Sequence, residues 1–193
     1  MKTPKPMLVI AEVKTQSPFG WKSSRSWDDL FEIACRVGDC ISIHTDPRWG
    51  GSMDLVRRAR SMTNKLILAK GIHQTDDEVR EALDAGADTV LVVGRVPNIE
   101  PTKVYVEPAT LKELWRLPRR INAVWNARNV WTGEPKYETF GEARVLRRGW
   151  LCQASFIRTW ADVDRRADAI LVGTHLPEFA ESPKIPFPLL LGR

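Results

Sequence analysis

Short apolar runs rich in Val, Ile, Leu and Ala alternate along the chain with segments of helical patterning. The runs have the length and composition of buried strands, and we predict strands over Met7–Val13, Cys40–Thr45, Leu66–Ala69, Thr89–Val93, Val104–Val106, Ala123–Trp125, Leu151–Ala154 and Ala169–Val172. The intervening patterns predict helices over Trp27–Val37, Met53–Ser61, Asp76–Ala85, Thr110–Arg116, Glu142–Arg148 and Trp160–Arg166. Alternation of this kind indicates a parallel sheet with helical crossovers.

Eight strand and helix units predict a compact α/β fold, the (β/α)₈ barrel, although about 200 residues is the lower edge for it. Residues 94–103 hold two prolines and are too few for a full crossover helix. We therefore expect the fourth helix to be missing or reduced to a turn. No internal repeat or separate linker is visible, so we expect one domain over residues 1–193, with an irregular proline-rich tail from about Ser182.

The first strand ends in two charges. Period-two alternation places Glu12 and Lys14 on the same face as Ile10. Unpaired charges on a buried face are strongly disfavoured. A functional site is the leading explanation, and a structural ion pair remains an alternative.

Polar residues also stand at the ends of later strands. Lys70 closes the third strand and Glu107 the fifth, and Asn126 and Arg128 follow the sixth. Taken singly, each is more often a solvated surface residue. In a barrel, however, the carboxyl ends of the strands converge on the active site. We therefore expect these side chains to share one pocket with the charges of the first strand.

Composition narrows the class of protein. The chain has 193 residues, 43% hydrophobic and 27% charged, which suits a soluble domain with a full core. No apolar stretch approaches the roughly 20 residues that span a bilayer, and Met1–Pro6 lacks the apolar block of a secretory signal. We expect a cytoplasmic protein with no membrane partner.

The net charge of +5 is spread along the chain without a recognisable nucleic-acid module. A basic pocket for phosphate or carboxylate explains the excess as well, so no nucleic-acid partner is expected. The three cysteines and three histidines lack the spacing of paired metal ligands. We expect reduced cysteines and no metal site.

Seven segments, in order and in register, resemble the motifs of the indole-3-glycerol-phosphate synthase family. They run from residue 8 to about 179 and comprise Ile10–Lys14 with Ser17-Pro18, His44–Asp46 with Gly51-Ser52, Leu68–Lys70, Ala85–Leu91, Val106-Glu107, Asn126–Arg128 and Leu171–Thr174. The resemblance implies a lyase of tryptophan biosynthesis. Its reaction closes the ring of 1-(2-carboxyphenylamino)-1-deoxyribulose 5-phosphate with loss of carbon dioxide and water, and it needs no cofactor.

The resemblance also implies catalytic roles. Lys70 would be the general acid that protonates the ketose oxygen, with its pKa lowered by a confined pocket. Glu107, Glu12 and Lys14 are the candidates for the second acid–base pair, and Lys14 could instead anchor the substrate carboxylate.

Further residues are expected to bind the substrate, a small anilino-sugar phosphate. Ser17, Asn126, Arg128 and Trp49 are the substrate-binding candidates; alternatively Arg128 pairs with Glu107, and Trp49 packs within its own domain. Phosphate would be held by Ser155, Phe156, Gly173 and Thr174, aided by a short helix near Leu176. Residues 16–26 have the polar, flexible character of a lid. The protein is expected to be a monomer or a homodimer.

The seventh strand departs from the family pattern. The family reads Glu-Ser-Gly-Ile where this chain has Ala154-Ser155-Phe156-Ile157. A carboxylate and a glycine are absent, so we expect a phosphate site that is present but modified. The alternative function is a barrel that binds a phosphorylated ligand or a partner enzyme without turnover. A third possibility, a phosphosugar isomerase, would require a Cys/Asp acid–base pair at the strand ends. Retention of Lys70 and Glu107 favours the enzyme.

Overall fold

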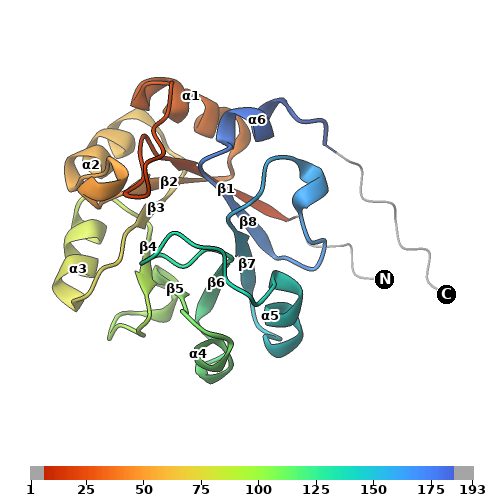
Figure 1. Cartoon of the computed structure of the whole chain (residues 1–193). Coiled ribbons are helices and arrows are strands. Elements are labelled where there is room, and N and C mark those ends of the chain that lie inside the picture. The colour runs from red at the N-terminus through yellow and green to blue at the C-terminus, as the bar shows by residue number, and fades with distance from the viewer. Residues whose placement is uncertain (1–6, 185–193) are drawn as a thin grey trace, which may run out of the picture.

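The protein is a closed barrel of eight parallel strands in chain order, as seen in a computed structural model that describes residues 7–184 (Figure 1). The strands are β1 (Leu8–Val13), β2 (Cys40–His44), β3 (Leu66–Lys70), β4 (Thr89–Val93), β5 (Val104–Glu107), β6 (Asn122–Asn126), β7 (Leu151–Ala154) and β8 (Ala169–Val172). Strand β8 pairs in parallel with β1, with Leu8 opposite Ala169, and this pairing closes the barrel. The eight predicted strands are confirmed, each end within one residue.

Helices surround the barrel and cover the outer faces of the strands (Figure 1). They are α1 (Trp27–Val37), α2 (Met53–Met62), α3 (Asp76–Asp84), α4 (Leu111–Arg116), α5 (Phe140–Leu146) and α6 (Leu176–Glu181), with single 3₁₀ turns η1 (Pro47–Trp49), η2 (Pro101–Lys103) and η3 (Trp160–Asp162). The link between β4 and β5 is reduced to the turn η2, as expected. No helix within residues 7–184 is long and apolar enough to cross a membrane.

Two helix predictions need correction. The segment predicted as Glu142–Arg148 begins at Phe140, because Thr139 caps the helix and Glu142 completes its capping box. The helix predicted over Trp160–Arg166 is wrong, since only the turn η3 forms there. The Asp164 carboxylate accepts a hydrogen bond from the backbone N–H of Arg166, which gives this segment a local alternative to helical bonding.

Strand alternation separates two packed layers. Inward-facing residues fill the barrel in one buried cluster, whose members include Ile10, Leu68 and Val124. The neighbouring positions on each strand pack outward, chiefly under the helices. Two residues beyond each of these three, the same face carries a polar side chain at the carboxyl end of the strand: Glu12, Lys70 and Asn126. This step of two places the polar residues at one mouth of the barrel.

A recurrent clasp joins the strands in pairs at the opposite end. Asp39, Asp88 and Asp168 each precede an even-numbered strand. Each side chain accepts a hydrogen bond from a backbone N–H of the preceding strand, at 2.9, 2.8 and 2.9 Å from Val9, Ile67 and Leu151. The backbone N–H of the same aspartate donates to the carbonyl of that same residue. The sequence showed no internal repeat because the signal shared by the three copies is only a small residue followed by Asp.

The expectation of an irregular tail falls mostly on residues 185–193, which lie outside the described residues. The described part of that segment, Ser182–Lys184, follows the end of α6. The three cysteines are free thiols, in agreement with the expectation of reduced cysteines.

Candidate active site

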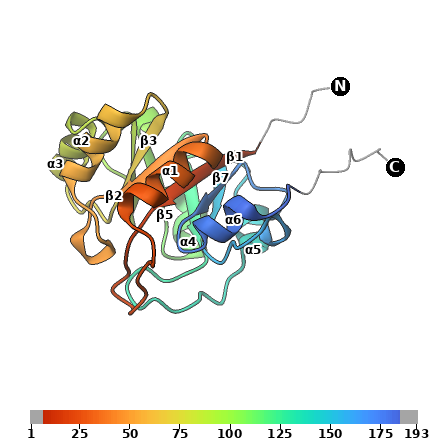
Figure 2. The same ribbon diagram turned by 90° about the horizontal axis from the view of Figure 1, so that it is seen from above.

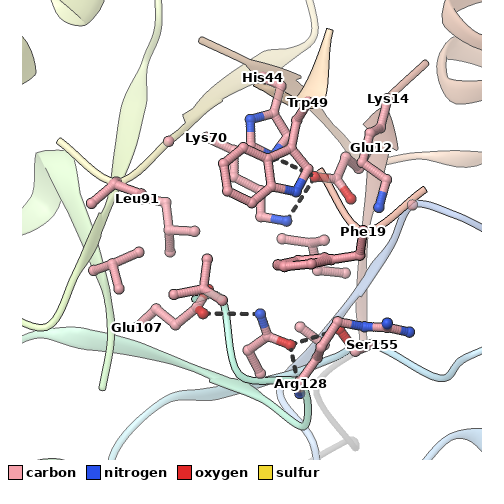
Figure 3. Close-up of a pocket in the computed structure, with 18 residues that line it drawn as sticks. Glu12, Lys14, Phe19, His44, Trp49, Lys70, Leu91, Glu107, Arg128 and Ser155 are labelled. Atoms are coloured by element: carbon pink, nitrogen blue, oxygen red, sulfur yellow. Dashed lines mark hydrogen bonds and ion pairs between the residues drawn. The ribbon is translucent and has the colours of Figure 1, made fainter. Parts of the chain in front are cut away.

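A pocket opens at the carboxyl ends of the strands (Figure 3). Nine of the residues expected at the site line it: Glu12, Lys14, Trp49, Lys70, Glu107, Asn126, Arg128, Ser155 and Gly173. Ser17, Phe156 and Thr174 do not line it. Ser17 lies in the loop after β1, where its hydroxyl accepts a hydrogen bond from the backbone N–H of Phe19.

Glu12 and Lys70 form a buried ion pair. The Nζ of Lys70 donates to Oε1 of Glu12 at 2.7 Å, and only 3% of the Glu12 side chain is exposed. Burial acts to raise the pKa of Glu12, but Lys70, Lys14 and His44 outweigh it and bring the pKa to about 2. Both groups therefore stay charged at neutral pH.

The expected lowering of the Lys70 pKa is wrong. Burial does act to lower it, but the carboxylates of Glu12 and Glu107 and the hydrogen bond to Glu12 together outweigh burial. The pKa of Lys70 is therefore raised above its usual value. Desolvation alone would lower this pKa, and the Glu12 carboxylate on the same face of the barrel reverses the direction.

The pKa values of Lys14 and Glu107 are shifted in the directions that favour the uncharged form of each group. Burial lowers the pKa of Lys14 to about 8, partly offset by Glu12 and reinforced by Lys70 and Arg128. Burial also raises the pKa of Glu107, despite the nearby ammonium of Lys70. The four ionisable groups thus divide into one fixed ion pair, Glu12 with Lys70, and two groups whose uncharged forms are favoured by burial, Lys14 and Glu107.

Asn126 organises the side of the pocket that faces Glu107. Its Nδ2 donates to Oε1 of Glu107 at 2.9 Å, while its Oδ1 accepts from the Ser155 hydroxyl at 2.6 Å and the Arg128 backbone N–H at 3.0 Å. The Nη1 of Arg128 donates to the carbonyl of Gly133 at 3.0 Å. Asn126, and not an Arg128 ion pair, therefore supplies the direct hydrogen bond to Glu107.

The expected phosphate residues have other partners as well. The Thr174 hydroxyl accepts a hydrogen bond from Nζ of Lys14 at 2.8 Å. A Cβ at Gly173 would stand 1.9 Å from Oε2 of Glu12, so this glycine is needed for the approach of the Glu12 carboxylate. Ser155 and Phe156 both have positive φ angles, of 71° and 57°.

The further residues that line the pocket include His44 and Phe19. The Nε2 of His44 lies 3.4 Å from Oε1 of Glu12, and burial together with the charge of Lys70 lowers its pKa to about 3, so it is neutral near pH 7. Its ring stacks on Trp49 with centroids 5.2 Å apart. Trp49 is itself buried and packs within its own domain in this way while lining the pocket.

Phe19 lies in residues 16–26, the segment that the sequence predicts to be a lid. Its ring meets Trp49 edge-on with centroids 6.5 Å apart. An aromatic residue between Pro18 and Gly20 was the only sequence signal for it, because its contacts come from distant loops.

The fold and the position of the site define the class of the protein. A closed (β/α)₈ barrel with polar side chains gathered at the carboxyl ends of its strands is the architecture in which this fold carries its active sites.

Comparison with known proteins defines the family. The family model described as indole-3-glycerol phosphate synthase matches residues 1–116, more than half of the chain. The chain belongs to that family. The match includes Glu12, Lys14, Lys70 and Glu107.

Solved structures share the fold at low sequence identity. A crystal structure of 3-hexulose-6-phosphate synthase is similar with a TM-score of 0.61 at 15% identity, covering 90% of this chain and 100% of that one. A monomeric variant of the dimeric phosphoribosylanthranilate isomerase from Thermotoga maritima has a TM-score of 0.61 at 11% identity, covering 88% of each chain. At such identities the likeness concerns the fold alone.

Proposed function

We propose that the protein is a lyase of the indole-3-glycerol-phosphate synthase type, acting on 1-(2-carboxyphenylamino)-1-deoxyribulose 5-phosphate. The observation that carries this proposal is that one pocket joins a buried ion pair, Glu12 with Lys70, to Lys14, whose pKa is lowered to about 8, and to Glu107, whose pKa is raised. The reaction needs both kinds of group. One cation must stabilise negative charge on the ketose oxygen, and one acid–base pair must then exchange protons.

Ring closure is the first step. The aromatic carbon that bears the carboxylate forms a bond to the ketose carbonyl carbon, and the carbonyl oxygen takes a proton. Lys70 supplies that proton, or the hydrogen bond that precedes its transfer, since Glu12 keeps the ammonium charged and holds it beside the pocket. The carboxylate then leaves as carbon dioxide, and its bonding electrons restore the aromatic ring.

Dehydration is the second step. The new hydroxyl leaves as water after it takes a proton, and a proton is lost from the adjacent carbon of the former sugar to complete the indole. Lys14, with a pKa of about 8, suits the acid in this step. Glu107 suits the base, because its raised pKa makes its carboxylate a stronger proton acceptor.

Substrate binding is proposed for residues beside the acid–base groups. The free guanidinium edge of Arg128 would meet an anionic group, and Asn126 and Ser155 would meet hydroxyls. Thr174, already bonded to Lys14, would share that ammonium with the phosphate.

Ala154 favours a second candidate function. It lines the pocket as a buried apolar residue where the family pattern has a carboxylate. A barrel altered in this way could bind a phosphorylated ligand, or serve a partner enzyme, without turning the ligand over.

A turnover assay separates the two candidates. The full chain is incubated with the carboxyphenylamino-deoxyribulose phosphate, and indole fluorescence is followed for the wild type, Lys70→Met and Glu107→Gln. The matched controls are Lys112→Met and Glu32→Gln, which change exposed residues on α4 and α1. We expect turnover by the wild type and both controls, and a fall in kcat of about 10²- to 10⁴-fold in each pocket variant. Binding of the product by the wild type without any turnover would instead support the second candidate.

A further inference from the structure

The turn that follows β7 has an unusual backbone. Ser155 and Phe156 are consecutive non-glycine residues with φ angles of 71° and 57°. Side chains are disfavoured in this region, and such residues persist where the surroundings hold them, often at functional sites. Ser155 lines the pocket, whereas Phe156 is 46% exposed and buries too little of its ring to account for its place by packing alone.

The ring of Phe156 lies beside the charged side chain of Arg128. The guanidinium carbon of Arg128 lies 4.7 Å from the centre of the ring, the geometry of a cation–π contact. Arg128 is also fixed by the bond from its Nη1 to Gly133 and by the bond from its backbone N–H to Asn126. Among residues 7–184, Nη1 is the one guanidinium nitrogen with a hydrogen-bond partner, so Nε and Nη2 can donate to a ligand.

Gly133, which accepts a hydrogen bond from Arg128, also contacts the predicted lid segment. Gly133 has a φ of 78°, and a Cβ there would stand 2.5 Å from the ring of Phe19. Phe19 therefore packs directly on the backbone of Gly133, and the loops after β1 and β6 extend together from the same end of the barrel (Figure 2). Lid, turn, Arg128 and Phe156 form one line of contacts across the mouth of the pocket.

We propose that Phe156 is a positioning residue that holds the Arg128 guanidinium at the mouth of the pocket as the receptor for an oxyanion of the ligand, a phosphate or a carboxylate. The aromatic face fixes the plane of the guanidinium, and Gly133 fixes one of its edges. The remaining edge is left to donate two parallel hydrogen bonds, the geometry that oxyanions accept best. The proposal rests on the proposed function for the nature of the ligand, and its test does not require turnover.

The test uses three substitutions at one position. Phe156→Tyr keeps the aromatic face, Phe156→Leu keeps a bulky side chain at the same backbone angle without that face, and Phe156→Gly removes both the ring and the conformational strain. The matched control is Tyr137→Leu, which removes a fully exposed aromatic side chain from the β6–α5 loop. Arg128→Gln removes the receptor itself. Thermal denaturation checks that each variant is folded.

Two readouts are measured by NMR on the full chain. The Hε signal of Arg128 reports the ring directly, because a proton above an aromatic face is shifted upfield. Titrations with inorganic phosphate and with benzoate give a dissociation constant for each oxyanion and distinguish phosphate from carboxylate as the preferred group.

We expect the upfield shift in the wild type and Phe156→Tyr, and its loss in Phe156→Leu and Phe156→Gly. Phe156→Leu and Phe156→Gly should also bind the preferred oxyanion about two- to fivefold more weakly, the range of an exposed cation–π contact. Tyr137→Leu and Phe156→Tyr should bind it as the wild type does. Binding in Phe156→Leu equal to the wild type, or binding of neither oxyanion by the wild type, would overturn the proposal. Phe156-dependent oxyanion binding in a protein that forms no indole would leave this inference standing and refute the proposed reaction. Indole formation by a protein whose oxyanion binding does not depend on Phe156 would refute this inference and leave the proposed reaction standing.

Discussion

Glu12 is the residue on which the charges of the pocket depend. Its carboxylate lies 2.7 Å from the ammonium of Lys70 and 3.4 Å from the imidazole of His44, and Gly173 leaves the space that it occupies. Removal of this one negative charge leaves the buried ammonium of Lys70 without its closest partner. Such uncompensated buried charge is costlier than the ion pair itself.

We therefore expect Glu12→Gln to lower the free energy of unfolding by about 3–5 kcal/mol. The pKa of Glu12 falls from 4.5 to about 2 on folding, so its contribution is complete above pH 4.5 and is lost as the pH falls toward 2. Urea denaturation at several pH values measures this, with Glu32→Gln as the exposed control. A Glu12→Gln protein as stable as that control at pH 7 would show that the ion pair does not organise the pocket.

Lys14 sets the alkaline limit of the proposed reaction. Because its pKa is lowered to about 8, it loses its proton as the pH rises through 8, and the proposed acid of the dehydration step is then lost. We expect kcat/KM to fall above about pH 8 in the wild type. In Lys14→Arg, whatever activity remains should lack this limb, because arginine stays charged. An unchanged alkaline limb in Lys14→Arg, with exposed Lys112→Arg as the control, would assign it to another group.

Predictions from the sequence differ most from the structure at the scale of single residues. Period-two alternation predicts correctly that Glu12 and Lys14 share a face, because strand geometry alone decides it. The pKa of Lys70 depends on partners from other strands, and their distances are set by closure of the barrel. The left-handed turn at Phe156 and its contact with Arg128 likewise arise only in three dimensions.

The aspartate clasps stabilise the barrel at the scale of its elements. Asp88 accepts from the backbone N–H of Ile67, donates its own N–H to the carbonyl of Ile67 and accepts from Nη2 of Arg60 at 3.3 Å. Asp39 and Asp168 repeat the bonds to the backbone on two other strand pairs. Each clasp fixes the register of neighbouring strands at the end of the barrel opposite the pocket.

Loss of one clasp should cost stability without altering the site. We expect Asp88→Ala to lower the free energy of unfolding by about 1–3 kcal/mol, because it leaves a strand N–H without its acceptor. Asp84→Ala, at the exposed end of α3, is the matched control and should stay within about 0.5 kcal/mol of the wild type. Equal effects of the two substitutions in urea denaturation would contradict a role for the clasp.

The elements themselves were largely predictable from the sequence. Strands formed where apolar β-type residues were bounded by turns, and α1, α2 and α3 formed where caps and amphipathic spacing agreed. The helix predicted from Trp160 does not form because a local hydrogen bond from the backbone N–H of Arg166 to the Asp164 side chain competes with helical bonding. Patterning of apolar residues does not weigh that competition.

At the scale of the whole molecule, the protein is a small barrel with several charged side chains close together at the carboxyl ends of its strands. The loops after β1, β2, β6 and β7 meet there through Phe19, Trp49, Gly133 and Phe156. The sequence indicates a lid but not its contacts, because these join loops that are far apart along the chain. The family match and the barrel together support the proposal of a ring-closing lyase, and Ala154 is the residue that argues against it.

Release of carbon dioxide tests this central claim most directly. Substrate labelled in its carboxylate is incubated with the wild type and with Lys70→Met, and labelled carbon dioxide is measured together with indole fluorescence. We predict equal amounts of carbon dioxide and indole product from the wild type, and loss of both in Lys70→Met but not in Lys112→Met. Release at the uncatalysed rate, or release unaffected by Lys70→Met, would contradict the account.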